Sequence, residues 1–335
     1  MIFKNEQHES FFKESLVKCR YQDIYHAALV YCLGISEDTR RNVDRIYDFT
    51  SGFVKTECLH EGWQTSGSLK IIRMAFNLYN NGTPSVSTTC VNLGIGLAKE
   101  GKRVLLIDAD AQGNMSACLG VAEPDELDVA LVNLMEKVVN DETWEPGEGI
   151  LRHDEGVDFL PANIELAGLE TTLVNVMSRE TIMRQYVYEM RQLYDYILID
   201  TMPSLGMMTI NALVAADSVL IPVEAAYLSV KGLQQLIKTI GRVHRQLNPG
   251  LQIEGILLTK VDRRTNFAKD ISEKLRGAYG EKIHIFENCI PLSIKAAETS
   301  AEGKSIFLHA PRGIVAEGYR ALTREVLSYE QPKCG

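Results

Sequence analysis

The stretch of residues 88–114 constrains the fold of this chain more than any other part of its sequence. The apolar residues in its first half suit a helix packed on a sheet, although a strand period also fits part of the run, and Gly101 is the expected stop signal. Residues 104–107 form a short apolar run, which is typical of a parallel strand covered on both faces. Asp108 and Asp110 follow this strand, at the edge where open α/β sheets bind ligands.

The chain after this stretch alternates between predicted strands and predicted helices. Apolar runs predict further strands at residues 157–160, 196–199, 218–222, 251–259 and 285–291. Helical periodicity predicts helices at residues 127–138, 181–193 and 314–329. Strands that alternate with helices in this way predict an α/β fold with a doubly wound, mostly parallel sheet.

The first 80 residues have a different pattern. Apolar residues recur at helical spacing in residues 11–19 and 24–31, Gly34 ends the second segment, and Ser36 is a candidate N-cap for the next helix. We therefore predict two parts, a small helical N-terminal region of residues 1–80 and an α/β domain of residues 81–335.

Composition excludes several classes of protein. With 45% hydrophobic and 24% charged residues the chain resembles an ordinary globular protein, and no run of 18 apolar residues predicts a membrane span. The seven scattered cysteines form no C-x-x-C motif, which fits reduced thiols in the cytoplasm. The net charge of −9 argues against a surface coated with lysine, although it leaves room for a local basic patch.

Three motifs carry a resemblance to a known family. V-L-L-I-D-A-D-A-Q-G-N at residues 104–114 resembles the D-x-D-P-Q-G-N segment of the ParA/Soj partition ATPases, which are relatives of MinD. Y-I-L-I-D-T-M-P-S-L-G at 196–206 is similar to the Walker B strand of that family, and G-I-L-L-T-K-V-D-R-R-T-N at 255–266 is a third match. The resemblance begins at about Ser87 and implies a P-loop NTPase-like fold with a deviant Walker A motif.

Residues 1–85 resemble a different family, a small helical bacterial family of unknown function. The residues that carry this resemblance are Y-H-A-A-L-V-Y-C-L-G, D-T-R-R-N, W-Q-T-S and R-M-A-F-N-L-Y-N. The chain therefore reads as a fusion in which the partition-ATPase part has lost its first strand. Residues 73–79 fit either a substitute strand or a helix, and without a substitute the sheet has an unpaired internal edge.

The phosphate loop departs from the family pattern. Residues 81–87, N-G-T-P-S-V-S, stand where the family has K-G-G-V-G-K-T, so that Asn81 and Val86 replace two lysines and Pro84 removes a backbone N–H donor. A P-loop binds phosphate with consecutive backbone N–H groups and with the positive charge of lysine. The start of the helix and the hydroxyls of Ser87 and Thr88 remain.

The resemblance implies a site for ATP and magnesium. It assigns the water-orienting, catalytic role to Asp110, because phosphoryl transfer depends on positioning and on charge neutralisation. The residues that it assigns to the nucleotide are Gly82, Ser87, Thr88 and Pro291, and those that it assigns to magnesium are Ser87, Asp108 and Asp200. The alternative is that the aspartates are inherited remnants on an inactive fold.

The family also binds DNA without sequence preference, as a homodimer whose hydrolysis is stimulated by a ParB-like centromere-binding partner. The resemblance places DNA contacts on Arg264 and Lys295, and Arg242 is a candidate to compensate for family arginines that are missing. Such contacts are to phosphates and depend on salt. Ordinary solvated charges explain these residues equally well. The resemblance implies a cytoplasmic, nucleoid-associated protein, and the last helix lacks the apolar and basic faces of a membrane helix.

Three functions follow from these observations. The chain is a partition protein that still binds and slowly hydrolyses MgATP, or a nucleotide-independent pseudo-ATPase that dimerises or binds DNA or a ParB-like partner. The third alternative is a fusion product without function, which the abrupt change of motif near Val86 favours.

Overall fold

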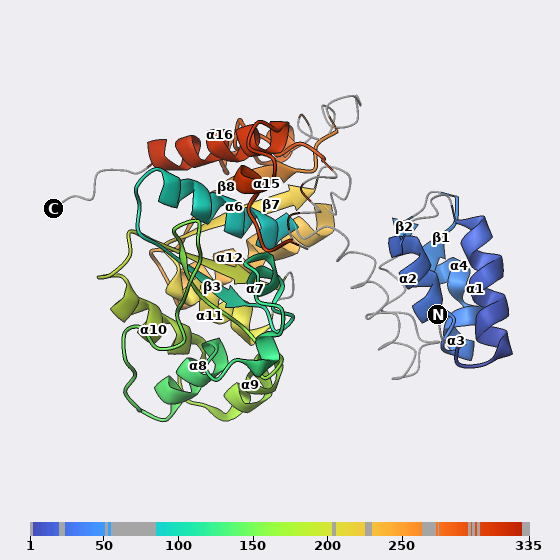
Figure 1. Ribbon diagram of the computed structural model, residues 1–335, viewed down its shortest axis with the longest axis horizontal. Coiled ribbons are helices and arrows are strands. Elements are labelled where there is room, and N and C mark those ends of the chain that lie inside the picture. Colours follow the sequence, from blue (N-terminus) through green and yellow to red (C-terminus); the bar gives the residue numbers. More distant parts are fainter. Residues whose placement is uncertain are drawn as a thin grey trace. The chain divides into compact units, whose positions relative to one another are not determined.

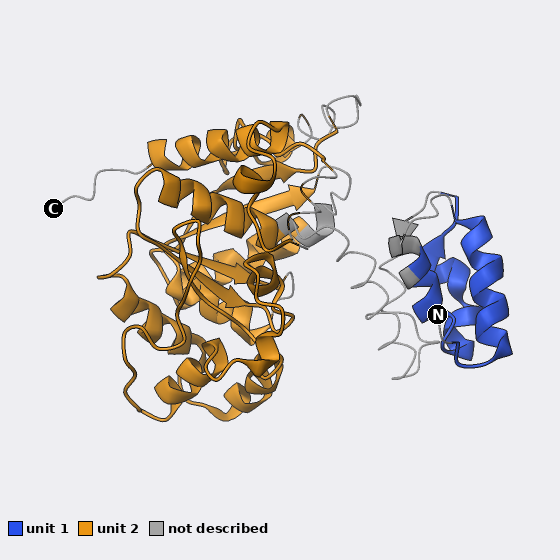
Figure 2. Cartoon of the chain, viewed as in Figure 1, with its two compact units in different colours: residues 1–84 blue, residues 85–335 orange. Residues whose placement is uncertain are grey.

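The computed structural model describes residues 3–19, 24–50, 53–54, 85–202, 206–224, 230–262, 273, 275–293, 296, 299 and 302–329. The chain divides into two compact units, residues 1–84 and residues 85–335 (Figure 2). The predicted boundary between residues 80 and 81 lies outside the described residues and stays a prediction.

Unit 1 is a small helical unit with a short hairpin. Its elements are α1 (Glu6–Lys18), α2 (Ile24–Leu33), α3 (Glu37–Arg41), α4 (Val43–Ile46), β1 (Tyr47–Asp48) and β2 (Phe53–Val54). The Ser36 side chain accepts a hydrogen bond from the Asp38 N–H, so the predicted N-cap is confirmed. Gly34 follows α2, and a β-carbon there would lie 2.4 Å from the buried ring of His8, so only glycine fits this helix end without a shift.

Unit 2 contains five predicted strands, β3 (Val104–Ala109), β5 (Asp158–Leu160), β6 (Tyr196–Thr201), β7 (Ser218–Glu224) and β8 (Gln252–Thr259). The short strand β4 (Leu151–Arg152) was not predicted. Strands β5, β3 and β6 pair in parallel, β7 pairs in parallel with β8, and only β4 is antiparallel to its neighbour. The expected strand at residues 285–291 is wrong for the described structure, because Ile285 and Pro291 each form only an isolated bridge.

Helices cover both faces of the sheets (Figure 1). They are α6 (Ser85–Lys99), α7 (Asn114–Cys118), η2 (Pro124–Glu126), α8 (Leu131–Val139), α9 (Leu166–Thr172), η3 (Leu173–Asn175), η4 (Arg179–Thr181), α10 (Ile182–Met190), α11 (Met207–Ala215), α12 (Val230–Gln246), α15 (Ile306–His309) and α16 (Ile314–Ser328). One core lies under α6, α7, α15 and α16, and a second lies under α8 to α11. The doubly wound α/β fold is confirmed.

Two predicted helices differ in their bounds. The helix expected from residue 127 begins at Leu131, because Pro124 starts a separate 3-10 turn and a further segment intervenes. The helix expected at residues 181–193 is α10 and ends at Met190. The predicted stop at Gly101 is confirmed, since its φ of +83° is the left-handed conformation that glycine adopts at a helix end.

The described strands form two separate parallel groups. One has the order β4-β5-β3-β6 and the other is β7-β8, so within the described part of the chain β6 and β7 each have one unpaired edge. All of β3 is buried, whereas most of β6 is only half-buried. Helix α6 packs against both β6 and β7 and therefore spans the place between them. A substitute first strand would pair at these edges, and residues 73–79, which we expect to form either that strand or a helix, lie outside the described residues.

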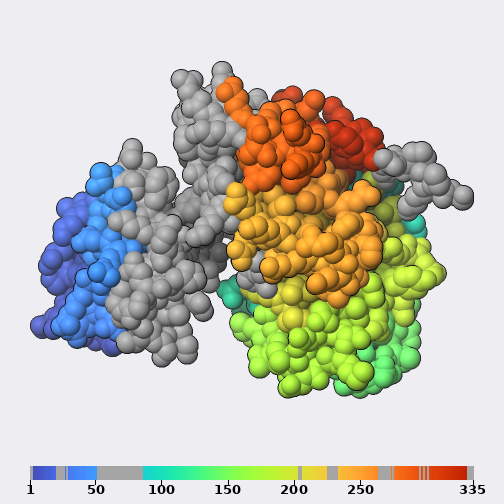
Figure 3. All heavy atoms as spheres, turned by 180° about the vertical axis from the view of Figure 1, so that it is seen from behind, coloured from blue at the N-terminus to red at the C-terminus, as the bar shows by residue number. Residues whose placement is uncertain are grey.

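Segments that are far apart in the sequence lie side by side on the surface of this unit. Seen from behind, the amber segments near residue 250 lie between green and orange segments (Figure 3). No helix within the described ranges is long and apolar enough to cross a membrane.

Candidate functional site

Two buried aspartates face the same edge of the sheet. Asp108 and Asp200 are register partners in the parallel pair β3 and β6, and both lie near the carboxyl ends of their strands. The exposed fractions of their side chains are 0% and 1%. Strand pairing alone therefore brings two of the predicted magnesium ligands together.

Asp108 is held by the loop that follows it. One oxygen accepts the Asp110 N–H at 3.1 Å, and the other accepts the Ser116 N–H at 2.8 Å and the Ser116 hydroxyl at 2.7 Å. Burial raises the pKa of Asp108 to about 6, although these hydrogen bonds oppose the shift. Ser116 also accepts the Ala162 N–H at 3.2 Å, so it joins Asp108 to the segment after β5.

Asp110 is oriented by its own turn. Its Oδ1 accepts the Gln112 N–H at 2.9 Å and its Oδ2 accepts the Asn114 amide at 3.2 Å. The turn needs Gly113, whose φ is +60°. Burial raises the pKa of Asp110 above its usual value. The carboxylate is thus fixed at the edge with part of its surface open.

The carboxyl group of Asp200 is buried, and among the described residues it lacks the hydrogen bonds of normal geometry that usually compensate for burial. Burial and then the nearby charge of Asp108 raise its pKa well above the usual value, and the Ser87 hydroxyl opposes this shift. Yet none of the described groups donates a hydrogen bond of normal geometry to either carboxylate oxygen of Asp200. A buried carboxylate without donors is costly, so a proton or a cation must satisfy it.

The N-terminal end of α6 lies beside Asp200. Ser87 and Thr88 are buried there, and in the described structure the Thr88 hydroxyl has no hydrogen-bond partner. The Asn92 amide donates to the Thr88 carbonyl at 2.8 Å, and the Asn92 carbonyl oxygen accepts the Ile306 N–H at 2.9 Å. This chain of contacts fixes the first turn of α6.

These residues fit a magnesium ion bound together with phosphate. An orphaned carboxylate and two hydroxyls offer the hard oxygen atoms that magnesium prefers. No group of three or more His, Cys, Asp or Glu residues within the described ranges could hold a metal alone. Magnesium commonly takes one or two carboxylates and completes its shell with substrate phosphates and water, so the donor set is consistent with it.

The other end of the edge carries an ion pair that the sequence did not single out. Lys260 follows β8 and forms an ion pair with Glu224 at the end of β7. Pro291 is buried and bridges to Val261, next to Lys260. The available signal was a lysine placed directly after a strand whose second half, G-I-L-L-T, is buried and mostly apolar. Ser116 was also missed, because the sequence does not show which side chain reaches Asp108.

The predicted residues fall into three groups. Ser87, Thr88, Asp108, Asp110 and Asp200 lie together at the edge, and Pro291 lies beside β8. Arg242 is an exposed residue of α12, outside this group. Gly82, Arg264 and Lys295 lie outside the described residues.

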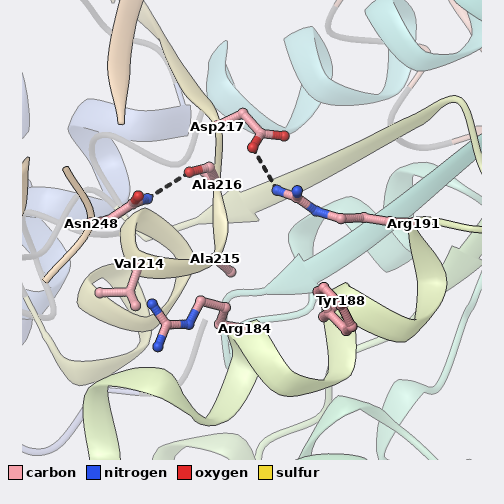
Figure 4. A pocket seen from close by; sticks show the side chains of 8 residues that line it. All are labelled: Arg184, Tyr188, Arg191, Val214, Ala215, Ala216, Asp217 and Asn248. Carbon is pink, nitrogen blue, oxygen red and sulfur yellow. Dashed lines mark hydrogen bonds and ion pairs between the residues drawn. The ribbon is translucent and has the colours of Figure 1, made fainter. Parts of the chain in front are cut away.

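A pocket of about 200 Å³ lies elsewhere, and its residues come from α10, from the segment before β7 and from the loop before β8 (Figure 4). There Arg191 forms an ion pair with Asp217 at 2.6 Å, and the Asn248 amide donates to the Ala216 carbonyl at 2.7 Å. Because these segments precede the strands, the pocket belongs to the opposite edge of the sheet. It contains none of the predicted site residues.

Family models match both parts of the chain. The model of an AAA domain matches residues 70–253, and the model of a family of unknown function matches residues 1–93. The two matches overlap over residues 70–93. The match to the AAA domain therefore begins earlier than the resemblance at about Ser87 suggests.

Comparisons with known structures identify the class of protein to which the second unit belongs. Cobyrinic acid a,c-diamide synthase from Mycobacterium smegmatis is 30% identical with a TM-score of 0.63, and the match covers 73% of this chain and 90% of that one. McdA from Cyanothece is 19% identical with a TM-score of 0.61 over 73% of this chain and 96% of that chain, which shows a common fold. The fold and the carboxylates at its edge define an α/β domain of the P-loop NTPase type.

Within that class, the sporulation initiation inhibitor protein Soj of Bacillus subtilis is 41% identical over 244 residues, which are 72% of this chain and 92% of Soj. The chromosome partitioning protein ParA of Myxococcus xanthus is 38% identical over 276 residues, or 81% and 92% of the two chains. The chain therefore belongs to the ParA/Soj family of partition proteins.

Proposed function

We propose that this ParA/Soj-like partition protein is a switch that binds MgATP at the edge formed by β3, β6 and the start of α6. The observation that carries the proposal is the Asp200 carboxylate, which is buried beside Ser87 and Thr88 and receives no hydrogen bond of normal geometry from a described group. A buried carboxylate of this kind destabilises the fold unless a bound cation offsets its desolvation.

Relatives support the choice of ligand. The synthase from Mycobacterium smegmatis was solved with bound ADP and magnesium, and it is 31% identical to this chain with a TM-score of 0.62. The same synthase was also solved with an ATP analogue and magnesium. The ParA relatives from Myxococcus xanthus and Caulobacter vibrioides are chromosome partitioning proteins.

The proposed roles come from the family resemblance, and the described part of the edge supports them. Asp200, Asp108 and Ser87 would hold magnesium, which supplies positive charge against the phosphates when it is bound. Asp110 is oriented by Gln112 and Asn114 and would position the attacking water. Gly82 and Thr88 would contact phosphate, and Pro291 would pack against the base.

The DNA-bound state is part of the same proposal. A homodimer would bind DNA phosphates without base readout through Arg242, Arg264 and Lys295, and a ParB-like protein would stimulate hydrolysis. The proposed place of action is the nucleoid in the cytoplasm. Binding of this kind weakens steeply as salt rises.

Two alternatives rest on specific observations. Asn81 and Val86, in place of the two lysines, favour a nucleotide-independent pseudo-ATPase that binds partners or dimerises. The abrupt change of motif near Val86, inside the stretch where the two family matches overlap, favours a fusion product without function.

Calorimetric titration with MgATP and an assay of phosphate release test the proposal on four chains: the native protein, its Asp200→Asn and Asp110→Ala variants, and a version with K-G-G-V-G-K-T restored at residues 81–87. We expect the native chain to bind and Asp200→Asn to bind more weakly. Asp110→Ala should bind but lose turnover. If only the restored chain binds, the pseudo-ATPase alternative is correct. If neither the native nor the restored chain binds, the nucleotide site is absent.

A further inference from the structure

The ion pair of Lys260 and Glu224 has several features that are unfavourable for the stability of the fold. The two side chains have exposed fractions of 17% and 27%, so most of both charged groups is removed from water. Burial lowers the pKa of Lys260, and the carboxylate of Glu224 opposes that shift. In a mostly buried ion pair, the attraction between the two charges seldom exceeds the energy that is lost when both are removed from water.

The backbone of Lys260 is strained as well. Its φ is +52°, a left-handed conformation that residues other than glycine adopt rarely. Positions of this kind cluster at ligand-binding sites, where the surrounding structure imposes the conformation. The neighbouring Val261 is tied to the Pro291 segment, since it donates to Ile290 and accepts from Leu292. The lysine is therefore held at a defined place at the end of β8.

Glu224 of the ion pair and Asp200 lie on strands that one helix contacts. Helix α6 packs against β6, which carries Asp200 one residue before its end, and against β7, which ends in Glu224. The register that places Glu224 opposite Thr259 brings Lys260 one residue beyond the same edge. Ser87, in the first turn of α6, lies beside Asp200, and Lys260 lies at the same carboxyl edge of the strands.

Among the described residues, Lys260 supplies the positive charge at this edge. Among the described residues within three positions of the carboxyl ends of β3, β5, β6, β7 and β8, it is the one lysine or arginine. Asp108, Asp110, Asp200 and Glu224 contribute carboxylates to the same edge. A triphosphate entering there needs a cationic side chain, and Asn81 and Val86 no longer supply one.

We propose that Lys260 is the phosphate-binding cation of this chain and that it replaces the missing P-loop lysines by exchanging Glu224 for the nucleotide phosphates. The proposal rests on the proposed nucleotide binding and names the residue that makes it possible. Lysine suits this exchange, because its ammonium group is a point charge on a flexible stem. Glu224 holds the charge in place when no nucleotide is bound.

Calorimetry with MgATP and with magnesium tripolyphosphate tests this exchange on the full chain. The charge-balanced variant Lys260→Met with Glu224→Gln should weaken binding of both ligands about tenfold or more, as expected for a lost charged hydrogen bond. Glu224→Gln alone should tighten binding, because it removes the competitor for the ammonium group. If the ion pair only supported the fold, the double variant and Glu224→Gln would not change the affinity in opposite directions.

The matched control is the ion pair of Lys137 and Glu148, which has a similar exposure of 29% and 23% and lies on α8 and the loop after it. Lys137→Met with Glu148→Gln should leave both affinities unchanged. Thermal melting of each variant verifies that it is folded before titration.

Each failure is distinct. If the native chain binds neither ligand, the proposed function and the role of Lys260 are both overturned. If the native chain binds but the Lys260→Met, Glu224→Gln variant binds as tightly as the control, only the role of Lys260 is overturned. Weaker binding by Glu224→Gln alone also overturns it, because the pair would then act as a unit that supports the fold.

Discussion

Asp108 and Asp200 are direct register partners on neighbouring parallel strands, yet their surroundings differ completely. Asp108 accepts hydrogen bonds from Asp110 and Ser116, whereas Asp200 receives none of normal geometry from the described residues. One carboxylate is therefore a structural part of its loop. The other is left to interact with something the folded chain does not supply.

The first prediction concerns Asp200→Asn. The pKa of Asp200 is raised in the folded state, so the folded chain binds the proton more tightly than the unfolded chain does. Stability from this group is present below the unfolded pKa of about 3.8 and is lost as pH rises through the raised value. Asp200→Asn removes the titrating group, so the stability of the variant relative to the native chain should increase as pH rises through that raised value.

Denaturant unfolding at several pH values measures this difference. The stability of Asp200→Asn relative to the native chain should decrease as pH falls toward about 4, where the native carboxyl is protonated. The exposed Asp154 supplies the control, and Asp154→Asn should show no such trend. A stability difference between Asp200→Asn and the native chain that does not change with pH would contradict the assignment.

The second prediction concerns Ser116→Ala. This change removes the hydroxyl that donates to Asp108 and leaves the buried Ala162 N–H without its acceptor. We expect a loss of about 1–3 kcal/mol in unfolding free energy. The pKa of Asp108 should rise further, because a hydrogen bond to the charged form has been lost. Titration followed by the carboxyl NMR signal measures that rise.

Ser328→Ala is the matched control for this experiment, because the Ser328 hydroxyl donates to the Glu325 carbonyl at 2.7 Å near the end of α16. It should leave the pKa of Asp108 unchanged. An unchanged pKa in Ser116→Ala as well would show that this hydroxyl does not stabilise the charged carboxylate.

The third prediction tests the close packing of α6. A β-carbon at Gly96 would overlap the hydroxyl of Thr323 on α16, so Gly96→Ala should destabilise the protein by about 1–3 kcal/mol. Gly168 is a helical glycine with nothing within 4 Å of its β-carbon position. There the same change should stabilise by roughly 0.5–1 kcal/mol, because alanine favours helix. Thermal melts compare the two.

Adding Thr323→Ala to Gly96→Ala provides the second test. It removes the overlapping hydroxyl and should recover part of the loss. If the double variant is as unstable as the sum of the single variants, the two residues do not contact each other in the way the structure indicates.

The fourth prediction concerns acid stability and Glu325 on α16. Its burial opposes ionisation, but hydrogen bonds from the Glu287 and Asn288 N–H groups, the Asn288 amide and His284 outweigh burial and lower its pKa. Stability from this group is present above the unfolded pKa of about 4.5 and is lost as pH falls through the lowered value. Glu325→Gln should therefore flatten the acid side of the stability curve.

Melting temperatures between pH about 3 and 6 measure that effect. The exposed Glu317 on the same helix provides the control, and Glu317→Gln should keep the native pH dependence. Equal acid sensitivity of native protein and Glu325→Gln would exclude Glu325 as its source.

Much of the fold follows from local sequence patterns. The apolar run before Asp108 and its counterpart before Asp200 predicted two parallel strands, because a strand covered on both faces has no polar alternation. Local patterns were less reliable at element ends. Residues 285–291 are apolar like a strand, but the described structure pairs them only through the isolated bridges of Ile285 and Pro291.

The sequence by itself determined that this chain has two parts, that the second resembles partition ATPases and that two lysines are missing at residues 81 and 86. These conclusions need only residue identity and spacing. Tertiary structure decided that Asp200 receives no hydrogen bond of normal geometry from the described residues and that Lys260 pairs with Glu224, since both depend on which strands become neighbours. Contacts between residues far apart in the chain carry the energy of burial and charge, and no local pattern records them.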